Sequence, residues 1–420
     1  MRFDRTLASV TRPLAAFLLL AALTLVTGCS TSGSWVPGPN GPLLGYVLLT
    51  PTTDTLQIGG TRAFVAAALD TYSVAVASPM LEWSSSNTAV ATVSSSGLVT
   101  AVSEGVAQIV AAGNGAADTA TVFVYAQDGW YVQTSNTGNA LNGVFFQADG
   151  RRGVAVGDAG TLLTTSNAGA TWTVRTSGTS AALNSVWFTH PDTGWAVGAT
   201  GVVLKSVNGG LNWSRVTVSA SENLACVRFV GTRTGWIAGA GVILRTTNGG
   251  ATWTRSSPTA LQLNGLSFSD ASNGWAAGAN GVVLGTHDGG VSWYVVQPSL
   301  TSQALQAVVR RSNTAAWIVG AQGTLARTSA TVDSLAWTVS STGALHQLSG
   351  LSFVSATTGW AVGYNGTAAL ILATSNGGAS WTPQTSIATE ALNDVFFVDD
   401  QRGWAVGDGG RILHTARGGL

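Results

Sequence analysis

The sequence predicts an all-β protein in which a small β-sandwich precedes a seven-bladed β-propeller. Glycine accounts for 53 of the 420 residues and tryptophan for 16, which is typical of short strands joined by tight turns. The charged helix formers are scarce, because glutamate occurs at only four positions and lysine only at Lys205. From residue 128 onward, seven similar units start 39 to 44 residues apart. Four short strands in a unit of that length make a propeller blade.

The composition excludes two classes of protein. The chain has 19 basic and 19 acidic side chains, and charged residues make up only 9% of it, against roughly 25% in an average soluble domain. A nucleic-acid binder needs a broad cationic surface, which so few basic residues do not supply. The 45% of apolar residues also excludes a disordered chain.

The N-terminus predicts export and lipid anchoring. Three arginines precede an apolar run at residues 14–26, which is too short to span a bilayer and fits the core of a signal peptide. The segment Leu-Val-Thr-Gly-Cys that ends at Cys29 resembles a bacterial lipobox. We therefore expect residues 1–28 to be removed, Cys29 to be lipidated and residues 29–41 to form a flexible tether.

The lipobox resemblance implies a protein held outside the cytoplasm. Ser30, rather than an acidic residue, follows the cysteine and favours the outer membrane or the cell surface. The alternative is an ordinary signal peptide with an incidental cysteine.

Residues 42–126 predict the β-sandwich. Apolar and polar residues alternate there, and glycine-containing turns recur every eight to twelve residues. The segments Leu-Glu-Trp-Ser-Ser-Ser-Asn from Leu81, Val-Ala-Thr-Val from Val90 and Gly-Leu-Val-Thr-Ala from Gly97 resemble the bacterial immunoglobulin-like group 2 domain. That family implies a spacer or adhesion module, with Trp83 as the core residue between the sheets.

Residues 127–420 predict the propeller. Each unit contains variants of Leu-Asn-x-Val, Gly-Trp-Ala-Val-Gly and Gly-Val-Val-Leu. The seven units begin at Leu141, Leu183, Leu224, Leu263, Leu305, Leu348 and Leu392. The last unit lacks its tryptophan strand, and a matching segment stands before the first unit at 129–135. We expect this segment to complete the seventh blade, because ring closure removes both open sheet edges. A six-bladed ring with a stray strand is the alternative.

A turn of the form Thr/Ser-x-Asn/Asp-x-Gly-x-x-Trp ends most units. We expect the Asn or Asp side chain to accept N–H groups two residues on, Gly to adopt a positive φ and Trp to cover the hairpin. The turn is identified as an Asp-box, or BNR repeat, at Asn167 and Trp172, Asn208 and Trp213, Asn248 and Trp253, Asp288 and Trp293, and Asn376 and Trp381. In the fifth unit Val332 and Ser334 replace the key residues, which predicts a longer, irregular hairpin.

Together these motifs, over about 290 residues, resemble the photosystem II stability/assembly factor family. The resemblance implies a lumenal seven-bladed propeller without enzymatic activity, which binds a reaction-centre precursor during assembly. We therefore expect a non-catalytic scaffold that binds a protein partner as a monomer, with no cofactor and no metal.

A local excess of basic residues suggests the binding surface. Lys205 and Arg245 occupy the same position in adjacent units, and so do Arg215 and Arg255, two residues after the Asp-box Trp. The family resembled here carries a surface arginine patch, which implies that these four residues receive an acidic or carboxylate-bearing segment. The alternative is that they only make the ring soluble.

An enzyme is the competing hypothesis, because Asp-boxes also occur in sialidases and other glycosidases. This would make the protein a surface glycan-binding or glycan-cleaving propeller. Candidates for a tyrosine nucleophile and its activating acid are Tyr131, Tyr294, Tyr364, Glu222 and Glu390. A carboxylate pair would come from Asp158 and Asp408, which lie in equivalent turns of the first and seventh units.

Other chemistry has little support in the sequence. Asn280 and Asn365 occupy similar turns without an acid, so the two aspartates are explained equally well as turn formers. The four histidines, at 190, 287, 346 and 414, lack metal-ligand spacing. Cys226 lies in an apolar alternation and is expected in the core. We expect no catalytic and no metal site.

Overall fold

The computed structural model describes residues 44–77, 79–125, 129–296, 300–312, 315–328, 337–343 and 345–419. Regular structure in these residues consists of β-strands and short 3-10 turns, which confirms the all-β fold. None of the described segments is a helix long and apolar enough to cross a membrane. The predicted signal peptide, Cys29, the tether and the irregular fifth hairpin at Val332 and Ser334 lie outside the described residues.

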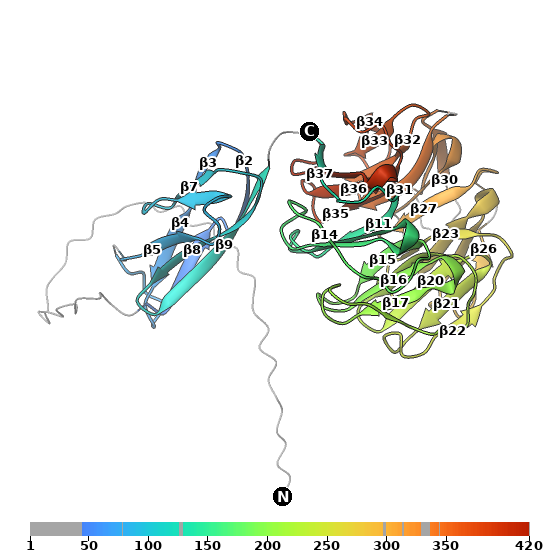
Figure 1. The fold of residues 1–420 in the computed structure, drawn as a ribbon, viewed down its shortest axis with the longest axis horizontal. Helices are drawn as coiled ribbons and strands as arrows, with labels where there is room; N and C mark the ends of the chain where they lie inside the picture. The colour runs from blue at the N-terminus through green and yellow to red at the C-terminus, as the bar shows by residue number, and fades with distance from the viewer. Residues whose placement is uncertain are drawn as a thin grey trace, which may run out of the picture. The chain divides into compact units, whose positions relative to one another are not determined.

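The first folded part is the predicted β-sandwich, coloured blue and cyan in Figure 1. Its strands are β1 (Tyr46–Thr50), β2 (Thr53–Gln57), β3 (Thr61–Ala63), β4 (Val65–Leu69), β5 (Glu82–Ser85), β6 (Ala91–Val93), β7 (Leu98–Ala101), β8 (Gly105–Gly113) and β9 (Ala116–Tyr125). They form the sheets β1-β4, β2-β9-β8-β5 and β3-β7-β6. Phe64, Val99 and Ile109 are buried between these sheets.

Trp83 lies at the margin of this core. The side chain packs against the core but is only half-buried. Its ring lies against Gly97, where a Cβ atom would come within 2.8 Å of it. The prediction that Trp83 belongs to the core is confirmed, although Phe64 and Ile109 are the largest side chains that are fully buried in it.

The second folded part is a propeller of seven four-stranded sheets. The first four blades contain β11 (Leu141–Phe146), β12 (Gly153–Gly157), β13 (Leu162–Thr165), β14 (Thr173–Val174); β15 (Leu183–Phe188), β16 (Gly194–Gly198), β17 (Val203–Ser206), β18 (Ser214–Arg215); β19 (Leu224–Val230), β20 (Thr234–Gly239), β21 (Val242–Thr246), β22 (Thr254–Ser256); and β23 (Leu263–Phe268), β24 (Gly274–Gly278), β25 (Val283–Thr286), β26 (Tyr294–Val295). The first strand of every blade is innermost, because the first strands of neighbouring blades pack against one another around the ring.

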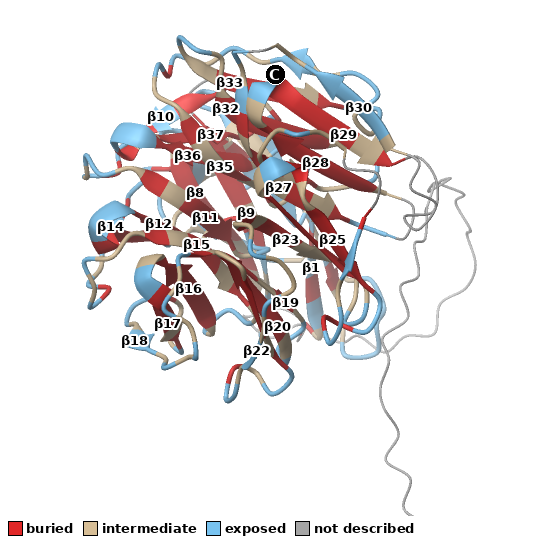
Figure 2. Cartoon of the chain, turned by 90° about the vertical axis from the view of Figure 1, so that its right-hand side faces the viewer, coloured by how far each residue is buried: buried red, intermediate tan, exposed pale blue. Residues whose placement is uncertain are grey.

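The remaining blades follow the same order. They contain β27 (Leu305–Arg310), β28 (Ala316–Gly320), β29 (Thr324–Thr328), β30 (Trp337–Ser341); β31 (Gln347–Phe353), β32 (Gly359–Tyr364), β33 (Ala369–Thr374), β34 (Thr382–Pro383); and β35 (Leu392–Phe397), β36 (Gly403–Gly407), β37 (Ile412–Thr415) with β10 (Tyr131–Gln133). Inner and middle strands are largely buried, whereas the outer turns are exposed (Figure 2).

The predicted ring closure is confirmed. Strand β10 pairs antiparallel with β37, so that Tyr131 lies opposite His414. Trp130 is buried, packs edge-on against Phe397 at 5.7 Å and donates from Nε1 to Gln384 Oε1 over 2.8 Å. The N-terminal strand therefore completes the seventh blade, and the six-bladed alternative is wrong.

Tryptophan connects neighbouring blades. In the third blade Trp236 stacks on Phe268 of the fourth blade, with ring centroids 3.4 Å apart and planes within 8°. Its Nε1 donates to the Gly289 carbonyl in the Asp-box of that same next blade over 2.7 Å. The equivalent stacked pairs are Trp195 with Phe229, Trp317 with Phe353, Trp360 with Phe397 and Trp404 with Phe146. The last pair joins the seventh blade to the first.

The glycine before each tryptophan is required by close packing. At Gly235 a Cβ atom would lie 2.4 Å from the ring of Phe229, which is opposite it in the same blade. The fifth blade differs at both positions, since Arg310 replaces the phenylalanine and Ala316 replaces the glycine. The Arg310 guanidinium lies 5.5 Å from the ring centroid of Trp275. A cation–π contact thus replaces the stacked ring there.

The hydrogen bonds that close the Asp-box turns differ from those predicted. Thr246 Oγ1 accepts the N–H groups of Asn248 and Gly250, two and four residues on. Asn248 Oδ1 instead accepts the N–H of Thr252, four residues on rather than two, over 3.0 Å. The other boxes repeat this pattern, for example at Asn376. The hydroxyl, which is closer to the backbone, reaches the nearer groups, and the longer amide spans the whole turn.

Candidate functional site

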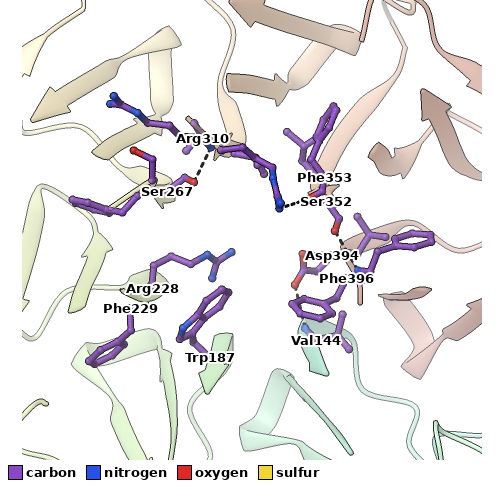
Figure 3. Close-up of a pocket in the computed structure, with 18 of the residues that line it drawn as sticks. Val144, Trp187, Arg228, Phe229, Ser267, Arg310, Ser352, Phe353, Asp394 and Phe396 are labelled. Atoms are coloured by element: carbon purple, nitrogen blue, oxygen red, sulfur yellow. Dashed lines mark hydrogen bonds between the residues drawn. The ribbon is translucent and has the colours of Figure 1, made fainter. Parts of the chain in front are cut away.

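The inner strands of the seven blades surround a cavity of about 430 Å³ on the propeller axis. Side chains four residues after the leucine that starts each unit line it, because alternate residues of a strand point to one face. They are Trp187, Arg228, Ser267, Val309, Ser352 and Phe396 (Figure 3). Every blade except the first thus contributes one side chain from the same position.

The two sides of the cavity differ in chemistry. Phe145 packs against Trp187 at 5.2 Å and against Phe396 at 4.9 Å, which makes an aromatic wall across the seventh, first and second blades. The opposite wall carries Ser267 and Ser352. Their hydroxyl oxygens accept backbone N–H groups of the next blade over 2.8 and 3.2 Å. The cavity therefore offers one apolar and one polar side.

Arg228 and Asp394 point toward one another inside the cavity (Figure 3). The Arg228 guanidinium lies 4.9 Å from the Trp187 ring centroid and donates from Nη1 to the Val227 carbonyl over 2.8 Å. The Asp394 carboxylate accepts the N–H groups of Val144 and Val395. Burial raises the pKa of Asp394 to about 6, against the opposing effects of the Arg228 charge and these two hydrogen bonds.

Two further arginines line the same cavity. Arg310 is buried at the end of β27, and the next residue, Arg311, is exposed and donates from Nη1 to the Phe353 carbonyl over 2.8 Å. The Arg310 guanidinium packs on Trp275, so the guanidinium groups of Arg228 and Arg311, against one carboxylate, give the lining a positive charge. Such a site suits an anion, because guanidinium binds carboxylate through two parallel hydrogen bonds.

The asparagine of the Leu-Asn-x-Val motif has a structural role. Asn184 donates from Nδ2 to the Leu224 carbonyl of the next blade over 2.8 Å, and Asn393 reaches Leu141 across the ring closure over 3.1 Å. The corresponding asparagines of the first and fourth blades do the same. These amides also line a second cavity of about 190 Å³, which shares Arg228 and Asp394 with the first.

The candidate carboxylate pair is engaged in this network. Asp158 begins the 3-10 turn η1 (Asp158–Gly160), and Asp408 begins the equivalent η6 (Asp408–Gly410). Each accepts an N–H from the asparagine of its own blade, Asn142 over 2.9 Å and Asn393 over 3.0 Å. This arrangement accounts for both residues as parts of the blade framework.

The other candidates for a glycosidase site are also engaged. Glu222 forms an ion pair with Arg255, and Glu390 with Arg411. The hydrogen bonds from these arginines lower the pKa of both carboxyl groups to about 2. The hydroxyls of Tyr131 and Tyr294 bond to His414 and His287 respectively, whereas Tyr364 is half-buried at the end of β32.

Cys226 is a free, buried thiol packed in the core between the third and fourth blades, as predicted. Over the described ranges no group of His, Cys, Asp or Glu is arranged to hold a metal ion.

The four predicted partner-binding residues do not lie on one face. Lys205 donates to the Gly249 carbonyl and Arg245 to the Gly289 carbonyl, so each contacts the Asp-box of the following blade. Arg215 pairs opposite Leu204, the residue before Lys205, and therefore points to the other face of its sheet. The same register places Arg255 away from Arg245. Their role in binding a partner stays a prediction.

Sequence reasoning missed most of the cavity residues. A signal was present, because Asp394 stands where the other six blades have Gly, Ser, Cys or Ala. Arg310 likewise stands where the other six have phenylalanine. Departures from a structural repeat are where function is expected to override the local rule. Aligning the seven units by position would have singled out both residues.

Solved structures share the propeller fold. One is "YCF48 bound to D1 peptide", 20% identical, with a TM-score of 0.59, where the match covers 69% of this chain and 96% of that chain. Another is YCF48 from Cyanidioschyzon merolae, 23% identical, with a TM-score of 0.57 and coverages of 68% and 98%. The WD40 β-propeller domain of Doa1 is 9% identical, with a TM-score of 0.56 and coverages of 69% and 97%. The curated proteins include no match.

Family models match both folded parts of the chain. The model for the bacterial Ig-like domain (group 2) matches residues 46–124. The model for the photosynthesis system II assembly factor YCF48 matches residues 122–220, 177–265 and 329–420, which together make up more than half of the chain. The chain therefore belongs to the YCF48 family of photosynthesis system II assembly factors.

Proposed function

We propose that this protein is an exported, lipid-anchored and non-catalytic scaffold whose propeller binds a carboxylate-bearing segment of another protein. The observation that carries the proposal is the axial cavity, where Arg228 and Arg311 lie with a single carboxylate, Asp394. The aromatic wall formed by Trp187 and its neighbours supplies apolar contact beside these charges.

The size of the cavity indicates an extended segment as the ligand. A volume of about 430 Å³ accommodates a few side chains or a chain terminus, and not a folded domain. A family member has been solved with a D1 peptide bound, and this supports a peptide as the class of ligand. Arginine has five N–H donors, so Arg228 retains binding capacity beyond its contacts to Val227 and Ser185.

The cavity is a better candidate surface than the four basic residues chosen from the sequence. Lys205 and Arg245 already donate hydrogen bonds to carbonyl groups of neighbouring blades, and Arg255 forms an ion pair with Glu222. A ligand would have to displace these contacts. In the cavity, the guanidinium groups of Arg228 and Arg311 line one space, and each retains N–H donors beyond the backbone carbonyl that it already contacts.

A peptide-binding experiment tests the proposal. Acidic peptides with free or amidated C-termini would be titrated into the soluble mature chain, with binding measured by isothermal titration calorimetry. Arg228→Gln with Arg311→Gln should weaken binding about tenfold or more, because charge-assisted hydrogen bonds contribute roughly twice as much as neutral ones. The matched control, Arg215→Gln with Arg255→Gln, should bind like wild type, and thermal melting would confirm folding of both variants.

Two results would redirect the assignment. Loss of binding only in the control variant would place the ligand on the outer surface of blades two and three. Turnover of a fluorogenic glycoside, or binding on a glycan array without any peptide binding, would favour the carbohydrate-active alternative.

Anchoring has its own test. Cys29→Ser should leave an unprocessed precursor or release soluble protein, because the modified thiol is absent. Unchanged membrane fractionation together with unchanged incorporation of a fatty-acid analogue would contradict lipidation at this cysteine.

A further inference from the structure

The two-stranded sheet of the β-sandwich exposes an apolar face. In β1 and β4 the inward residues, such as Val47 and Leu49, are buried in the core. The outward residues of both strands are Tyr46, Leu48, Thr50, Val65, Ala67 and Leu69, and the register places them side by side. We call this set the β1–β4 face. It contains no charged side chain.

The exposure of this face is unusual within the sandwich. Tyr46 is 56% exposed, Leu48 52% and Val65 65%. In the β3-β7-β6 sheet, the outward positions are more polar, since Thr61, Thr92 and Thr100 lie there beside one exposed large apolar residue, Leu98. Tyr72 and Val74, in the turn that follows β4, are also exposed. Since contiguous apolar surface of this kind marks a contact site, we expect the β1–β4 face to contact another molecule or surface.

A strand from a partner protein cannot pair with the free edge of β1 without displacing an existing hydrogen bond. The N–H of Leu49 in β1 donates to Asp118 Oδ2 over 2.8 Å, so the carboxylate occupies a backbone donor. In the turn after β4, Asp70 Oδ1 accepts the N–H groups of Tyr72 and Val74. A partner strand would have to displace the Asp118 contact. The contact surface is therefore the face of the sheet.

The position of the proposed anchor indicates a lipid surface as the occupant. Fourteen residues, 30–43, separate Cys29 from the first described residue, Leu44. At 3.3–3.6 Å per residue they span at most about 50 Å. Leu44 lies two residues before Tyr46, the first member of the β1–β4 face. A lipid-anchored chain thus enters the domain at the edge of this face.

The side chains of the face also suit lipid. Without charge, the face gains nothing from pairing with a charged protein surface. Tyrosine combines an apolar ring with a polar hydroxyl and is enriched where membrane meets water. Tyr46 and Tyr72 lie at and beside the face. We propose that the β1–β4 face lies against the membrane that holds the Cys29 anchor, a proposal that rests on the lipid anchoring given above.

Vesicle flotation of the unlipidated mature chain, carrying Cys29→Ser, tests the face independently of the anchor. The chain should float equally with neutral phosphatidylcholine vesicles and with vesicles containing phosphatidylglycerol. Tyr46→Ser, Leu48→Ser and Val65→Ser together should lower the bound fraction about tenfold, because interfacial binding scales with buried apolar area. The matched control replaces three exposed apolar residues of the propeller, Val207, Leu211 and Val291, with serine and should bind like wild type.

A label gives a second readout. A polarity-sensitive dye attached at Leu48→Cys should shift to the blue with vesicles, whereas a dye at Leu211→Cys should not; the native Cys226 is buried. Equal flotation of the triple variant and wild type would overturn the proposal. So would a concentration-dependent dimer, abolished by the triple variant, in a chain that does not bind vesicles. Lipidation of Cys29 is measured separately by fatty-acid labelling, so failure of the anchor and failure of the face are distinguishable.

Discussion

The closing strand should contribute more to stability than its three residues suggest. Replacing Trp130 by alanine removes a side chain that is only 3% exposed. It also removes the edge-on contact with Phe397 and the hydrogen bond to Gln384. Truncation of a buried tryptophan costs about 3–5 kcal/mol, well above the roughly 1 kcal/mol of an average point mutation.

The equivalent tryptophan of the second blade provides the comparison. Trp213 occupies the same Asp-box position but is half-buried, and its Nε1 donates within its own turn to Gly210. Trp213→Ala should therefore cost less than Trp130→Ala. Only Trp130 directly precedes the strand that joins the two ends of the ring, through the pairing of β10 with β37.

Differential scanning calorimetry and urea unfolding of the mature chain would measure both variants. The propeller transition should shift clearly further for Trp130→Ala than for Trp213→Ala, and the transition of the β-sandwich should stay in place. Equal shifts in the two variants, or a loss below about 1 kcal/mol for Trp130→Ala, would refute the argument that ring closure through β10 stabilises the propeller.

Three further outcomes follow from the packing. Gly235→Ala should destabilise the propeller by about 1–3 kcal/mol in urea unfolding, because its Cβ would meet a buried ring at 2.4 Å, whereas Gly138→Ala, with open space around it, should be nearly neutral. Arg310→Phe alone should crowd Ala316, and adding Ala316→Gly should recover stability, so a double-mutant cycle should give a coupling of about 0.5–3 kcal/mol; simple additivity would contradict this account of the fifth blade. The raised pKa of Asp394, about 6 in the folded protein against 3.8 ordinarily, means that the folded state binds the extra proton, so stability falls as pH rises from about 4 to about 6. Asp394→Asn should flatten that part of the stability–pH curve, and parallel curves for the two proteins would exclude the assignment.

Much of the fold could be predicted from local patterns. The unit length and the alternation of apolar residues predicted seven blades, and the unmatched segment before the first unit predicted the closing strand β10. These features can be predicted from the sequence because strand and turn formation depend on residues close together in the chain. The buried Cys226 followed from the same alternation.

The candidate site was decided by tertiary structure. Arg228, Arg311 and Asp394 belong to the third, fifth and seventh blades and line one cavity only because the ring closes. Equally, sequence symmetry placed Lys205 and Arg245 at equivalent positions but did not show that each contacts the next blade's Asp-box. A repeat determines where each strand begins and ends. Which side chains meet depends on sheet register and on the packing of one blade against the next, and both are set by contacts between residues distant in the sequence.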